Sequence, residues 1–481
     1  MIKHYKFKTK PYEHQLEALE KSWAQKTYAL FMEMGTGKSK VLVDNIAMLY
    51  DRGAIRGVLI VAPKGVYKNW HDIEIPVHLP DHVEHTKVLW EPTQTKKKQL
   101  ELDTLFDGGA DLKVLIMNIE AFSTNKGLDF AHSFLNIFLG KALIGIDEST
   151  TIKNPTAKRT KNILTIGNLA SYRRILTGSP VTKSPLDLYS QCEFLDPYHL
   201  GHQSYYSFRA RYANMVKRNF GGRQVQLVAS YRKLDELAEK LDLFSYRVLK
   251  EDCLDLPPKV FTTRTVDLSE EQTKMYLTMK KAAIAEHKGK LMSSMSALTT
   301  LLRLHQITCG TFKADDGTIT QLKNNRLTAL MECLEETEGK AIIWATYRED
   351  IKNIVASLKK AYGEASTVEY HGGVDATLRQ DHIAQFQDVK GPTRYFVGNP
   401  STGGYGITLT AANTVIYYSN SYDLEKRLQS EDRAHRIGQT GSVTYVDLVS
   451  EKTIDERIIK SLKAKVNIAN EIMGEDIKDW I

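Results

Sequence analysis

The chain of 481 residues contains few cysteines and no long hydrophobic run, and each shortage excludes a class of protein. Its four cysteines (Cys192, Cys253, Cys309 and Cys333) form no closely spaced pair. We therefore expect neither a disulfide framework nor a zinc site, and the cysteines indicate a reducing compartment. No apolar run approaches the roughly 20 residues that span a bilayer, and the first residues carry no apolar signal core. These features predict a soluble, cytoplasmic protein with no membrane partner.

Composition and charge are those of an ordinary globular chain. Apolar residues make up 42% and charged residues 26% of the sequence. The net charge of +7 results from 65 Lys+Arg against 58 Asp+Glu, which is compatible with a nucleic-acid partner but does not establish one. The length predicts about two to three domains of roughly 100–200 residues each, with no internal repeat between them.

Two stretches alternate short apolar runs with helix-like segments, a pattern typical of a parallel sheet covered by helices. In the first stretch, strands are expected at Tyr28–Met32, Val58–Ala62, Val114–Asn118, Leu143–Asp147 and Arg174–Thr177. In the second, they are expected at Ala341–Ala345, Thr367–Tyr370, Arg394–Val397, Thr414–Tyr418 and Thr444–Val449. The sequence thus predicts an α/β fold with two lobes.

The region between these stretches is rich in helix formers and carries helix-start signals. Ser269–Gln272 and Ser184–Asp187 are predicted capping boxes, and a third signal at Thr453 predicts a last helix running to Asn470. We expect a first lobe at 1–196, a helical insertion at 197–325, a second lobe at 326–450 and a C-terminal helix at 451–481. That helix is either a brace between the lobes or a surface helix of the second lobe.

The segment Gly35-Thr36-Gly37-Lys38-Ser39 follows a predicted strand and precedes a helical run, Val41–Tyr50, which is the context of a phosphate-binding loop. Glycines allow backbone N–H groups to converge on phosphate oxygens, and the helix N-terminus favours negative charge. Lys38 would reach the β- and γ-phosphates of ATP, and the Ser39 hydroxyl would bind Mg²⁺. Met32 stands where the general pattern has its first glycine.

Asp147 and Glu148 stand at the end of another predicted strand. A carboxylate pair in this position suits an Mg²⁺ ligand, Asp147, followed by a base, Glu148, that orients the attacking water. Alone, such a pair is usually a solvated loop or a helix cap. The phosphate-loop pattern earlier in the chain favours the catalytic interpretation.

Ordered motifs along nearly the whole chain resemble those of the Swi/Snf-type ATPases, a branch of helicase superfamily two. The motifs are Val61–Lys64 (Ia), Ile146–Asn154 (II), Arg174–Pro180 (III), Ala341–Trp344 (IV), Ser401–Ala412 (V) and Asp432–Gln439 (VI). The resemblance implies two tandem RecA-like lobes and the use of ATP and Mg²⁺. It also implies DNA-stimulated ATPase activity.

The same resemblance implies roles for individual residues. Gln15 would read the adenine edge, Tyr12 or His14 would stack on the ring, and Gly406 of motif V would lie at the nucleotide. Arg433 and Arg436 would reach across a cleft to the γ-phosphate, a contribution of roughly 10³–10⁵ in rate in related phosphoryl-transfer enzymes. Two arginines at this spacing otherwise indicate one solvated helix face.

The sequence departs from the family in one place, because Ser149-Thr150 follows Glu148 where the family has Ala-His. The histidine is thought to link the γ-phosphate to motif III. We therefore hypothesise that Ser149 or Thr150 forms a shorter hydrogen-bonded link to Thr177.

Between Pro197 and Leu234 the chain has no acidic residue but many basic and aromatic ones. Basic residues follow phosphates and aromatic rings stack on bases, so this segment is a candidate nucleic-acid surface. A helical insertion with a solvated basic face is the alternative. The candidate contacts are Arg209, Arg211, Lys217 and Arg218, with Gly221-Gly222 as a flexible turn.

The resemblance also implies generic contacts to the sugar-phosphate backbone. These are Lys64 and Gly65 of motif Ia, Thr346 and Tyr347 after motif IV, and Thr402, Gly403 and Gly404 of motif V. Backbone contacts carry no sequence information, so we expect little sequence preference. Lys96–Lys98 is interpreted as a solvated loop.

The sequence therefore predicts a monomeric, ATP-dependent translocase on double-stranded DNA, in replication, recombination or repair. A strand-separating or branch-migrating helicase acting on forks, junctions or RNA–DNA hybrids is the first alternative. A nucleotide-gated clamp that binds nucleic acid but barely turns over is the second, and the five catalytic candidates argue against it.

Overall fold

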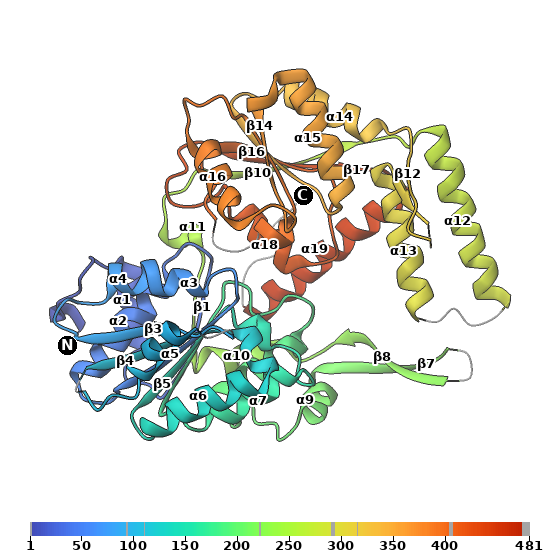
Figure 1. Cartoon of the computed structure of the whole chain (residues 1–481). Coiled ribbons are helices and arrows are strands. Elements are labelled where there is room, and N and C mark those ends of the chain that lie inside the picture. The colour runs from blue at the N-terminus through green and yellow to red at the C-terminus, as the bar shows by residue number, and fades with distance from the viewer. Residues whose placement is uncertain are drawn as a thin grey trace. The chain divides into compact units, whose positions relative to one another are not determined.

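The computed structural model describes residues 2–92, 95–109, 111–220, 223–289, 294–314, 316–403 and 407–473. The chain divides into two compact units, which are coloured along the sequence in Figure 1. Unit 1 contains the chain up to Met215, Val228–Asp255 and residues 468–473, and unit 2 contains Val216–Leu227 and Leu256–Asn467. Within the described ranges, no helix combines the length and the apolar character that a membrane span requires.

Unit 1 is built on a seven-stranded sheet in the order β3-β4-β2-β5-β6-β1-β9, with every neighbouring pair parallel. Its strands are β1 (Thr27–Met32), β2 (Gly57–Ala62), β3 (His85–Leu89), β4 (Leu112–Asn118), β5 (Ala142–Asp147), β6 (Tyr172–Leu176) and β9 (Ser245–Val248). Because all strands run the same way, the loops after β1, β5, β6 and β9 leave from one edge of the sheet. Ligands of open parallel sheets bind at this edge.

Helices cover both faces of the unit 1 sheet because its strands are buried on both sides. Along β1, Tyr28, Leu30 and Met32 join one hydrophobic cluster, whereas Ala29 and Phe31 join the other. The first cluster is completed by α1 (Glu13–Ser22), α2 (Lys38–Asp51), α3 (Tyr67–Asn69), η2 (Trp70–Glu74) and α4 (Ile75–His78). The second is completed by α5 (Lys96–Asp103), η3 (Ile119–Ser123), α6 (Asn125–Ile137), η4 (Ser149–Ile152), α7 (Lys158–Gly167), η5 (Pro185–Asp187), α8 (Leu188–Leu195), α9 (Tyr205–Tyr212) and α10 (Leu234–Asp242).

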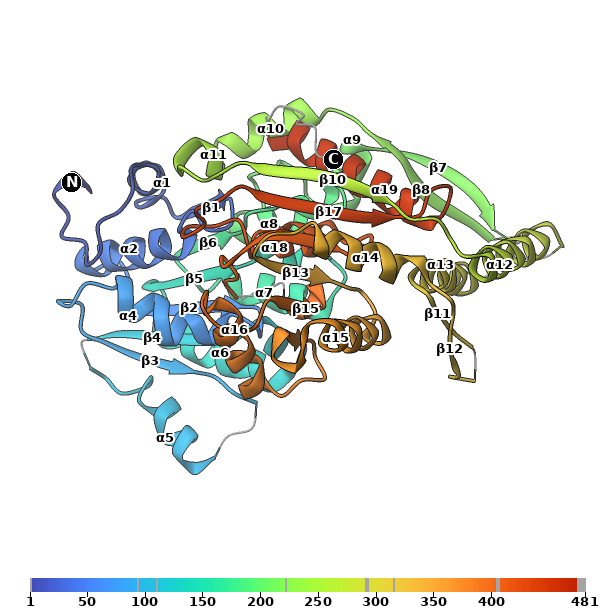
Figure 2. The same ribbon diagram turned by 90° about the horizontal axis from the view of Figure 1, so that it is seen from above.

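Unit 2 contains a six-stranded parallel sheet in the order β10-β17-β16-β13-β15-β14. Its strands are β10 (Lys259–Thr265), β13 (Lys340–Trp344), β14 (Thr367–Tyr370), β15 (Tyr395–Gly398), β16 (Ala412–Tyr417) and β17 (Val443–Val449). Figure 2 shows β10 and β17 lying side by side. The α/β fold with two parallel-sheet lobes is thus confirmed.

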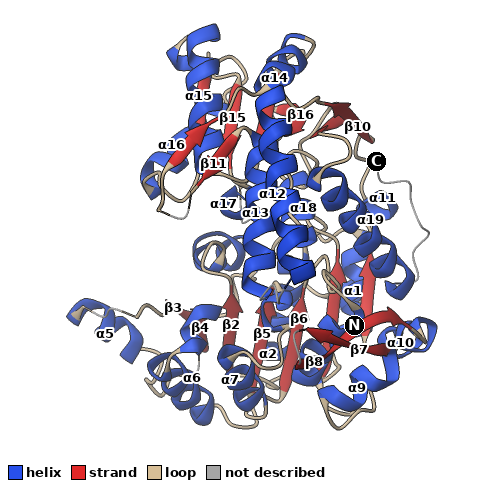
Figure 3. Cartoon of the chain, turned by 90° about the vertical axis from the view of Figure 1, so that its right-hand side faces the viewer, coloured by secondary structure: helices blue, strands red, loops and turns tan. Residues whose placement is uncertain are grey.

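The helices of unit 2 are α12 (Glu270–Gly289), α13 (Ser294–Cys309), α14 (Asn325–Glu335), α15 (Arg348–Tyr362), α16 (Ala376–Gln387), α17 (Pro400–Gly403), α18 (Leu424–Glu431) and the first part of α19 (Ile454–Met473). In Figure 3, α12 and α13 lie side by side as a helical pair. The capping box at Ser269 is confirmed, since its hydroxyl accepts from the Gln272 N–H at 3.2 Å and Gln272 Oε1 accepts from the Ser269 N–H at 3.0 Å. Ser184 forms no such side-chain cap.

The segment 197–325 is not purely helical, which corrects the sequence-based expectation. It contains β9, an edge strand of the unit 1 sheet, and β10, an edge strand of the unit 2 sheet. It also contains the paired strands β7 (Ala213–Phe220) and β8 (Arg223–Tyr231), which follow α9 in Figure 1. It also holds α11 (Lys250–Cys253) and the short pair β11 (Thr311–Lys313) and β12 (Ile319–Gln321). Gly221 and Gly222 lie outside the described residues.

Candidate active site

The predicted phosphate loop connects β1 to α2 in a conformation that depends on two glycines. Gly35 has φ +84° and Gly37 has φ +87°. This left-handed backbone conformation is unfavourable for residues that carry a Cβ. Gln15 fixes the loop from α1, because its Nε2 donates to the Thr36 carbonyl at 3.0 Å while Oε1 accepts from the Tyr12 N–H at 3.0 Å. His14 reaches the same carbonyl at 2.8 Å. Both side chains are buried against the loop.

We expect Gly37→Ala to impair nucleotide binding far more than folding. A Cβ at this position would lie 2.2 Å from Gln15 Nε2, so the loop or its anchor must move. We expect the Kd for a non-hydrolysable ATP analogue to rise about tenfold or more, which corresponds to about 1.4 kcal/mol. Gly140→Ala is the matched control, since Gly140 has φ +81° with no neighbour within 4 Å. Equal affinity in both variants, measured by calorimetry, would contradict this account of the loop.

Lys38 lies at the start of α2 and is 8% exposed. Its Nζ donates to the Glu33 carbonyl at 3.4 Å. Burial lowers the pKa of Lys38, and the nearby carboxylates of Glu148, Asp147 and Glu33 oppose this shift. The structure therefore brings the predicted phosphate-binding cation and the predicted carboxylate pair into one electrostatic cluster.

Asp147 ends β5 and is buried, with both carboxylate oxygens engaged. Oδ2 accepts from Trp70 Nε1 at 2.9 Å, and Oδ1 accepts from the Glu148 N–H at 3.0 Å. Burial raises the pKa of Asp147, and the Trp70 hydrogen bond and the charge of Lys38 oppose the rise. A bound cation would offset that desolvation, so the donor set suits a metal ion brought in with the nucleotide. Ser39, the other predicted Mg²⁺ ligand, is half-buried in the first turn of α2.

Glu148 adopts a left-handed backbone conformation, with φ 48° and ψ 61°, which is rare for a residue with this side chain. Its Oε2 accepts from Thr177 Oγ1 at 3.3 Å, and the Ser179 N–H donates to Thr177 Oγ1 at 3.2 Å. Backbone strain of this kind occurs where surrounding structure fixes a functional side chain. Motif III thus holds the predicted base directly.

The segment after β6 also packs against the phosphate loop. A Cβ on Gly178 would lie 3.0 Å from the Met34 nitrogen, so a side chain here would force the phosphate loop to shift by a few tenths of an ångström. Arg247 of β9 donates to the carbonyls of Phe31 at 3.0 Å and Gly178 at 2.9 Å. Glu33 Oε2 accepts from the Lys250 N–H at 2.8 Å. The last strand of the sheet therefore fastens both loops to each other.

Of the two residues predicted to link to Thr177, Ser149 does not do so, and the role of Thr150 stays a prediction. Ser149 Oγ donates instead to Gln191 Oε1 at 2.7 Å, and Gln191 Nε2 donates to the Pro180 carbonyl at 2.9 Å. The link from motif II to motif III therefore has two parts: Glu148 contacts Thr177, and Ser149 reaches Pro180 through Gln191. Sequence reasoning missed Trp70, Gln191 and Arg247, since none lies in a motif that it identified.

A groove of about 1000 Å³ lies beside the loop in unit 1 and is lined partly by Tyr12, His14, Tyr246 and Arg247. The rings of Tyr12 and His14 are stacked, with centroids 5.8 Å apart. Tyr12 is 53% exposed, whereas His14 is buried. Tyr12 is thus the more accessible of the two residues that were predicted to stack on adenine.

In unit 2, Arg433 and Arg436 lie on the turn after α18 and converge on one backbone group. Arg433 Nη1 donates to the Ile407 carbonyl at 3.1 Å, and Arg436 Nη1 donates to the same oxygen at 3.2 Å. Arg433 is 6% exposed. They therefore do not form the solvated helix face that was the alternative interpretation. Gly406, just before this carbonyl, lies outside the described residues.

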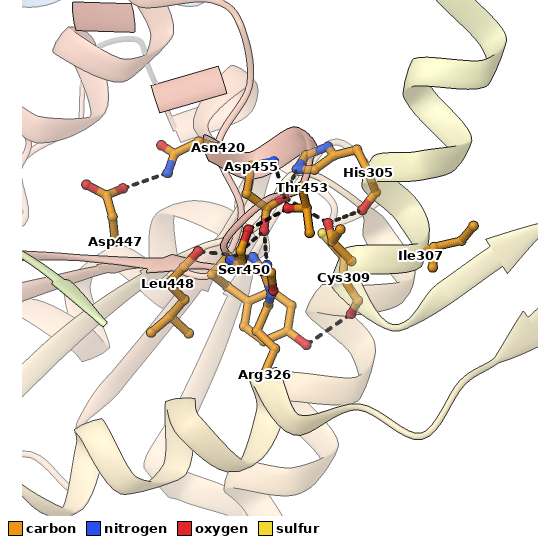
Figure 4. Close-up of polar contacts among 12 residues, drawn as sticks. His305, Ile307, Cys309, Arg326, Asn420, Asp447, Leu448, Ser450, Thr453 and Asp455 are labelled. Atoms are coloured by element: carbon orange, nitrogen blue, oxygen red, sulfur yellow. Dashed lines mark hydrogen bonds and ion pairs between the residues drawn. The ribbon is translucent and has the colours of Figure 1, made fainter. Parts of the chain in front are cut away.

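A buried ionic cluster centred on Arg427 of α18 lies next to the turn that carries Arg433 and Arg436. The Arg427 guanidinium forms ion pairs with Glu431 at 2.7 Å and Asp447 at 2.5 Å, and it lies 3.6 Å from the centroid of the Tyr417 ring. Asn420 donates to Asp447 at 2.6 Å, a contact drawn in Figure 4. The ion pair to Glu431, the last residue of α18, restrains the start of the turn.

The motif residues predicted to touch nucleic acid differ in their availability. Lys64 and Gly65 are exposed. Thr346 is half-buried, and its N–H donates to Ser419 Oγ at 2.9 Å. Tyr347 is also half-buried, with its hydroxyl 2.9 Å from Nδ1 of His305, a residue that faces Asp455 beside Arg326 in Figure 4. Thr402 and Gly403 lie on α17, and Gly404 lies outside the described residues.

The basic segment after Pro197 is partly structural. Phe208 and Tyr212 are buried in the core, and Arg211 is paired with Glu236. Arg209 lies over the ring of Tyr206, which is 70% exposed. The strand β7 carries two further exposed cations, Lys217 and Arg218. Lys96–Lys98 begins the helix α5, which corrects the expected loop.

Comparison with known proteins agrees with these features. The model of the SNF2-related domain matches residues 14–312, and that of the helicase conserved C-terminal domain matches residues 323–438. An uncharacterized ATP-dependent helicase of Mycoplasma genitalium is 26% identical over 456 residues, covering 92% of this chain and 40% of the relative. The SWI/SNF chromatin-remodeling complex subunit snf22 of Schizosaccharomyces pombe is 26% identical over 493 residues, covering 96% of this chain and 28% of that protein.

A solved structure, the SWI2/SNF2 ATPase core of Sulfolobus solfataricus in complex with dsDNA, is similar to 98% of this chain, with 94% of that chain covered, 24% identity and a TM-score of 0.43. The chain spans less than half the length of the two relatives above. The family matches imply the use of ATP. Because the SNF2-related match alone covers well over half of the sequence, the chain belongs to the SNF2-related family, as a SNF2-like helicase of superfamily two.

Proposed function

We propose that the chain is a DNA-dependent ATPase that translocates along double-stranded DNA. The observation that carries the proposal is the cluster of Lys38, Asp147 and Glu148 at one edge of a parallel sheet. It supplies a buried cation for phosphates beside two carboxylates. The paired arginines of unit 2, Arg433 and Arg436, supply the charge that such a site needs at the γ-phosphate.

The substrate of this site is ATP with its Mg²⁺. Lys38 and the loop N–H groups would bind the phosphates, while Asp147 and Ser39 would hold the metal. Two protein oxygens suit Mg²⁺, which keeps several waters and phosphate oxygens as ligands. Glu148 orients the attacking water and accepts its proton, and Thr177 holds the carboxylate in place. Closure on ATP and opening after hydrolysis would move the predicted DNA contacts of the first lobe relative to those of the second lobe.

Duplex DNA is the proposed track because the cations of α9 and β7 lie in a stretch without a carboxylate. Phosphate contacts give affinity with little sequence preference. A monomeric motor in replication, recombination or repair remodelling is the proposed context, by analogy with the family.

ATPase activity titrated against duplex, single-stranded and forked DNA and RNA tests the proposal. We expect the largest stimulation from duplex DNA. An ATPase rate that no duplex DNA increases would refute the proposal.

We expect Lys217→Ala combined with Arg218→Ala to weaken duplex binding without changing the unstimulated ATPase rate. Each lost phosphate contact should reduce the slope of log K against log salt by about 0.9, so the double variant should lose about 1.8. Fluorescence anisotropy over a range of salt concentrations measures this slope. The control is Lys96→Ala combined with Lys97→Ala, which removes the same charge from exposed residues of α5. A slope equal to that of the parent would exclude both cations from the DNA surface.

A strand-separating helicase is a second candidate, favoured by the β7–β8 pair. This ribbon exposes the apolar residues Val216, Val225 and Leu227, each 37–38% exposed, near its cations. Apolar side chains on such an element can separate stacked bases. Triplex displacement without unwinding of a forked duplex supports the translocase, whereas ATP-dependent unwinding supports the helicase.

A further inference from the structure

Gln191 lies at the centre of a buried hydrogen-bond network beside the candidate active site. Its side chain is fully buried on α8. Oε1 accepts from Ser149 Oγ at 2.7 Å, while Nε2 donates to the carbonyls of Pro180 at 2.9 Å and Asp187 at 2.8 Å. One carboxamide thus connects the loop after the predicted base, the loop of motif III and its own helix.

The segment between Pro180 and α8 is fixed by the same network. Asp187 Oδ2 accepts from the N–H groups of Thr182 at 3.0 Å and Lys183 at 2.7 Å. Lys153, three residues beyond Thr150, donates to Thr182 Oγ1 at 2.6 Å. The loop after motif II therefore contacts this segment at two points, through Ser149 and through Lys153. A displacement of one loop must move the other.

The opposite side of α8 packs against the basic helix α9. Tyr189 is two residues before Gln191, which places the two side chains on roughly opposite sides of the helix. The Tyr189 ring contacts Tyr205 and Phe208 of α9, with centroids 5.7 Å and 5.5 Å apart. Arg209, one residue after Phe208, is a predicted DNA contact. The helix α8 is therefore a short rigid connection between the hydrolytic residues and a candidate DNA-binding element.

A second contact joins the network to the β7–β8 ribbon. Tyr231 ends β8 and packs against the hydrophobic cluster that contains Leu186, Leu188 and Tyr189. Leu186 lies in the segment that Asp187 fixes. Both basic elements that follow Pro197 thus pack against a cluster that includes residues of one short stretch, 186–189.

We propose that Gln191 is a positioning residue that couples DNA binding at α9 to the orientation of Glu148. This inference rests on the proposed function, since it requires DNA to be the activator. DNA bound at α9 would shift α8, and Gln191 would pass the shift to Ser149, the neighbour of Glu148. The Ser149 hydroxyl supplies the coupling contact, which an alanine at this position could not form.

Gln191→Met tests the inference, because methionine keeps the length of the side chain but removes its donors and acceptor. We expect the stimulation of ATPase activity by saturating duplex DNA to fall about tenfold, within the roughly 5–150-fold range of typical couplings. The unstimulated kcat, the KM for ATP and the Kd for DNA should stay within about twofold, since no group that touches substrate is removed. Ser149→Ala should reproduce the loss, and the double variant should lose no more than the worse single variant.

Cys192→Ala is the control, because Cys192 is buried next to Gln191 but belongs to the apolar core. It should keep full stimulation.

Normal stimulation in both Ser149→Ala and Gln191→Met would overturn the inference while leaving the proposed function intact. A merely structural role would lower Tm and the unstimulated rate together, which also overturns it. If Gln191→Met does not fold, Ser149→Ala alone decides. A parent enzyme that no DNA stimulates would overturn the proposed function itself, and this inference with it.

Discussion

Arg433→Ala is expected to lower kcat for ATP hydrolysis by about 10³–10⁵, the contribution of an arginine that stabilises charge on the transferred phosphoryl group. Such a group acts mainly in the transition state, so the Kd for ATP should change only a few-fold. Arg436→Ala should behave similarly, because both guanidinium groups converge on the Ile407 carbonyl. Steady-state kinetics with saturating duplex DNA measure the loss.

Arg433→Lys and Arg457→Ala complete this experiment. Lysine keeps the charge but not the planar fork of donors, so it should recover only a small part of the lost rate. Arg457, an exposed residue of α19, should be dispensable. If Arg433→Ala and Arg436→Ala both hydrolyse ATP within tenfold of the parent, unit 2 does not complete the site, and the proposed motor loses its basis.

The second large effect is expected for Glu148→Gln, which should reduce kcat by about 10²–10⁴, the usual contribution of a general base. Glutamine retains an oxygen that can accept the Thr177 hydrogen bond, so the strained turn should persist. ATP should therefore still bind, and single-turnover kinetics should show a slow chemical step.

Glu120→Gln is the matched control, since Glu120 is an exposed glutamate just after β4, at the same edge of the sheet. Its substitution should leave the rate unchanged. A Glu148→Gln enzyme that is as fast as the parent would remove Glu148 from the chemistry and move the search for a base to Glu33, the other carboxylate beside Lys38.

Much of the fold was predictable because its central strands are buried on both faces. Runs such as Val58–Ala62 and Leu143–Ile146 consist of apolar residues and glycine, which favour a strand that is buried on both faces. The strands β3, β9 and β10 were missed because they lie at sheet edges and carry polar residues. In β10, for example, polar residues such as Thr262 and Thr263 interrupt the apolar pattern and are partly exposed. A local pattern cannot show that such a segment pairs with a distant strand.

The candidate site was predictable only where its residues form local patterns. Lys38 and Glu148 lie in short motifs with a strand before them, and the structure brings their charges together. Trp70 reaches Asp147 across 77 positions, and Gln191 reaches Ser149 across 42. No spacing rule connects such pairs. The error about Ser149 has the same origin, because its partner comes from a helix that the motifs do not include.

The cluster around Arg427 has a consequence for when bound ATP is hydrolysed. Its ion pairs hold Glu431 at the end of α18, directly before the turn that carries Arg433 and Arg436, so the backbone of this turn is anchored to unit 2. If hydrolysis needs them, the entire second lobe must travel with them. Under the proposed function, ATP bound to unit 1 alone would then be hydrolysed slowly, which limits futile turnover.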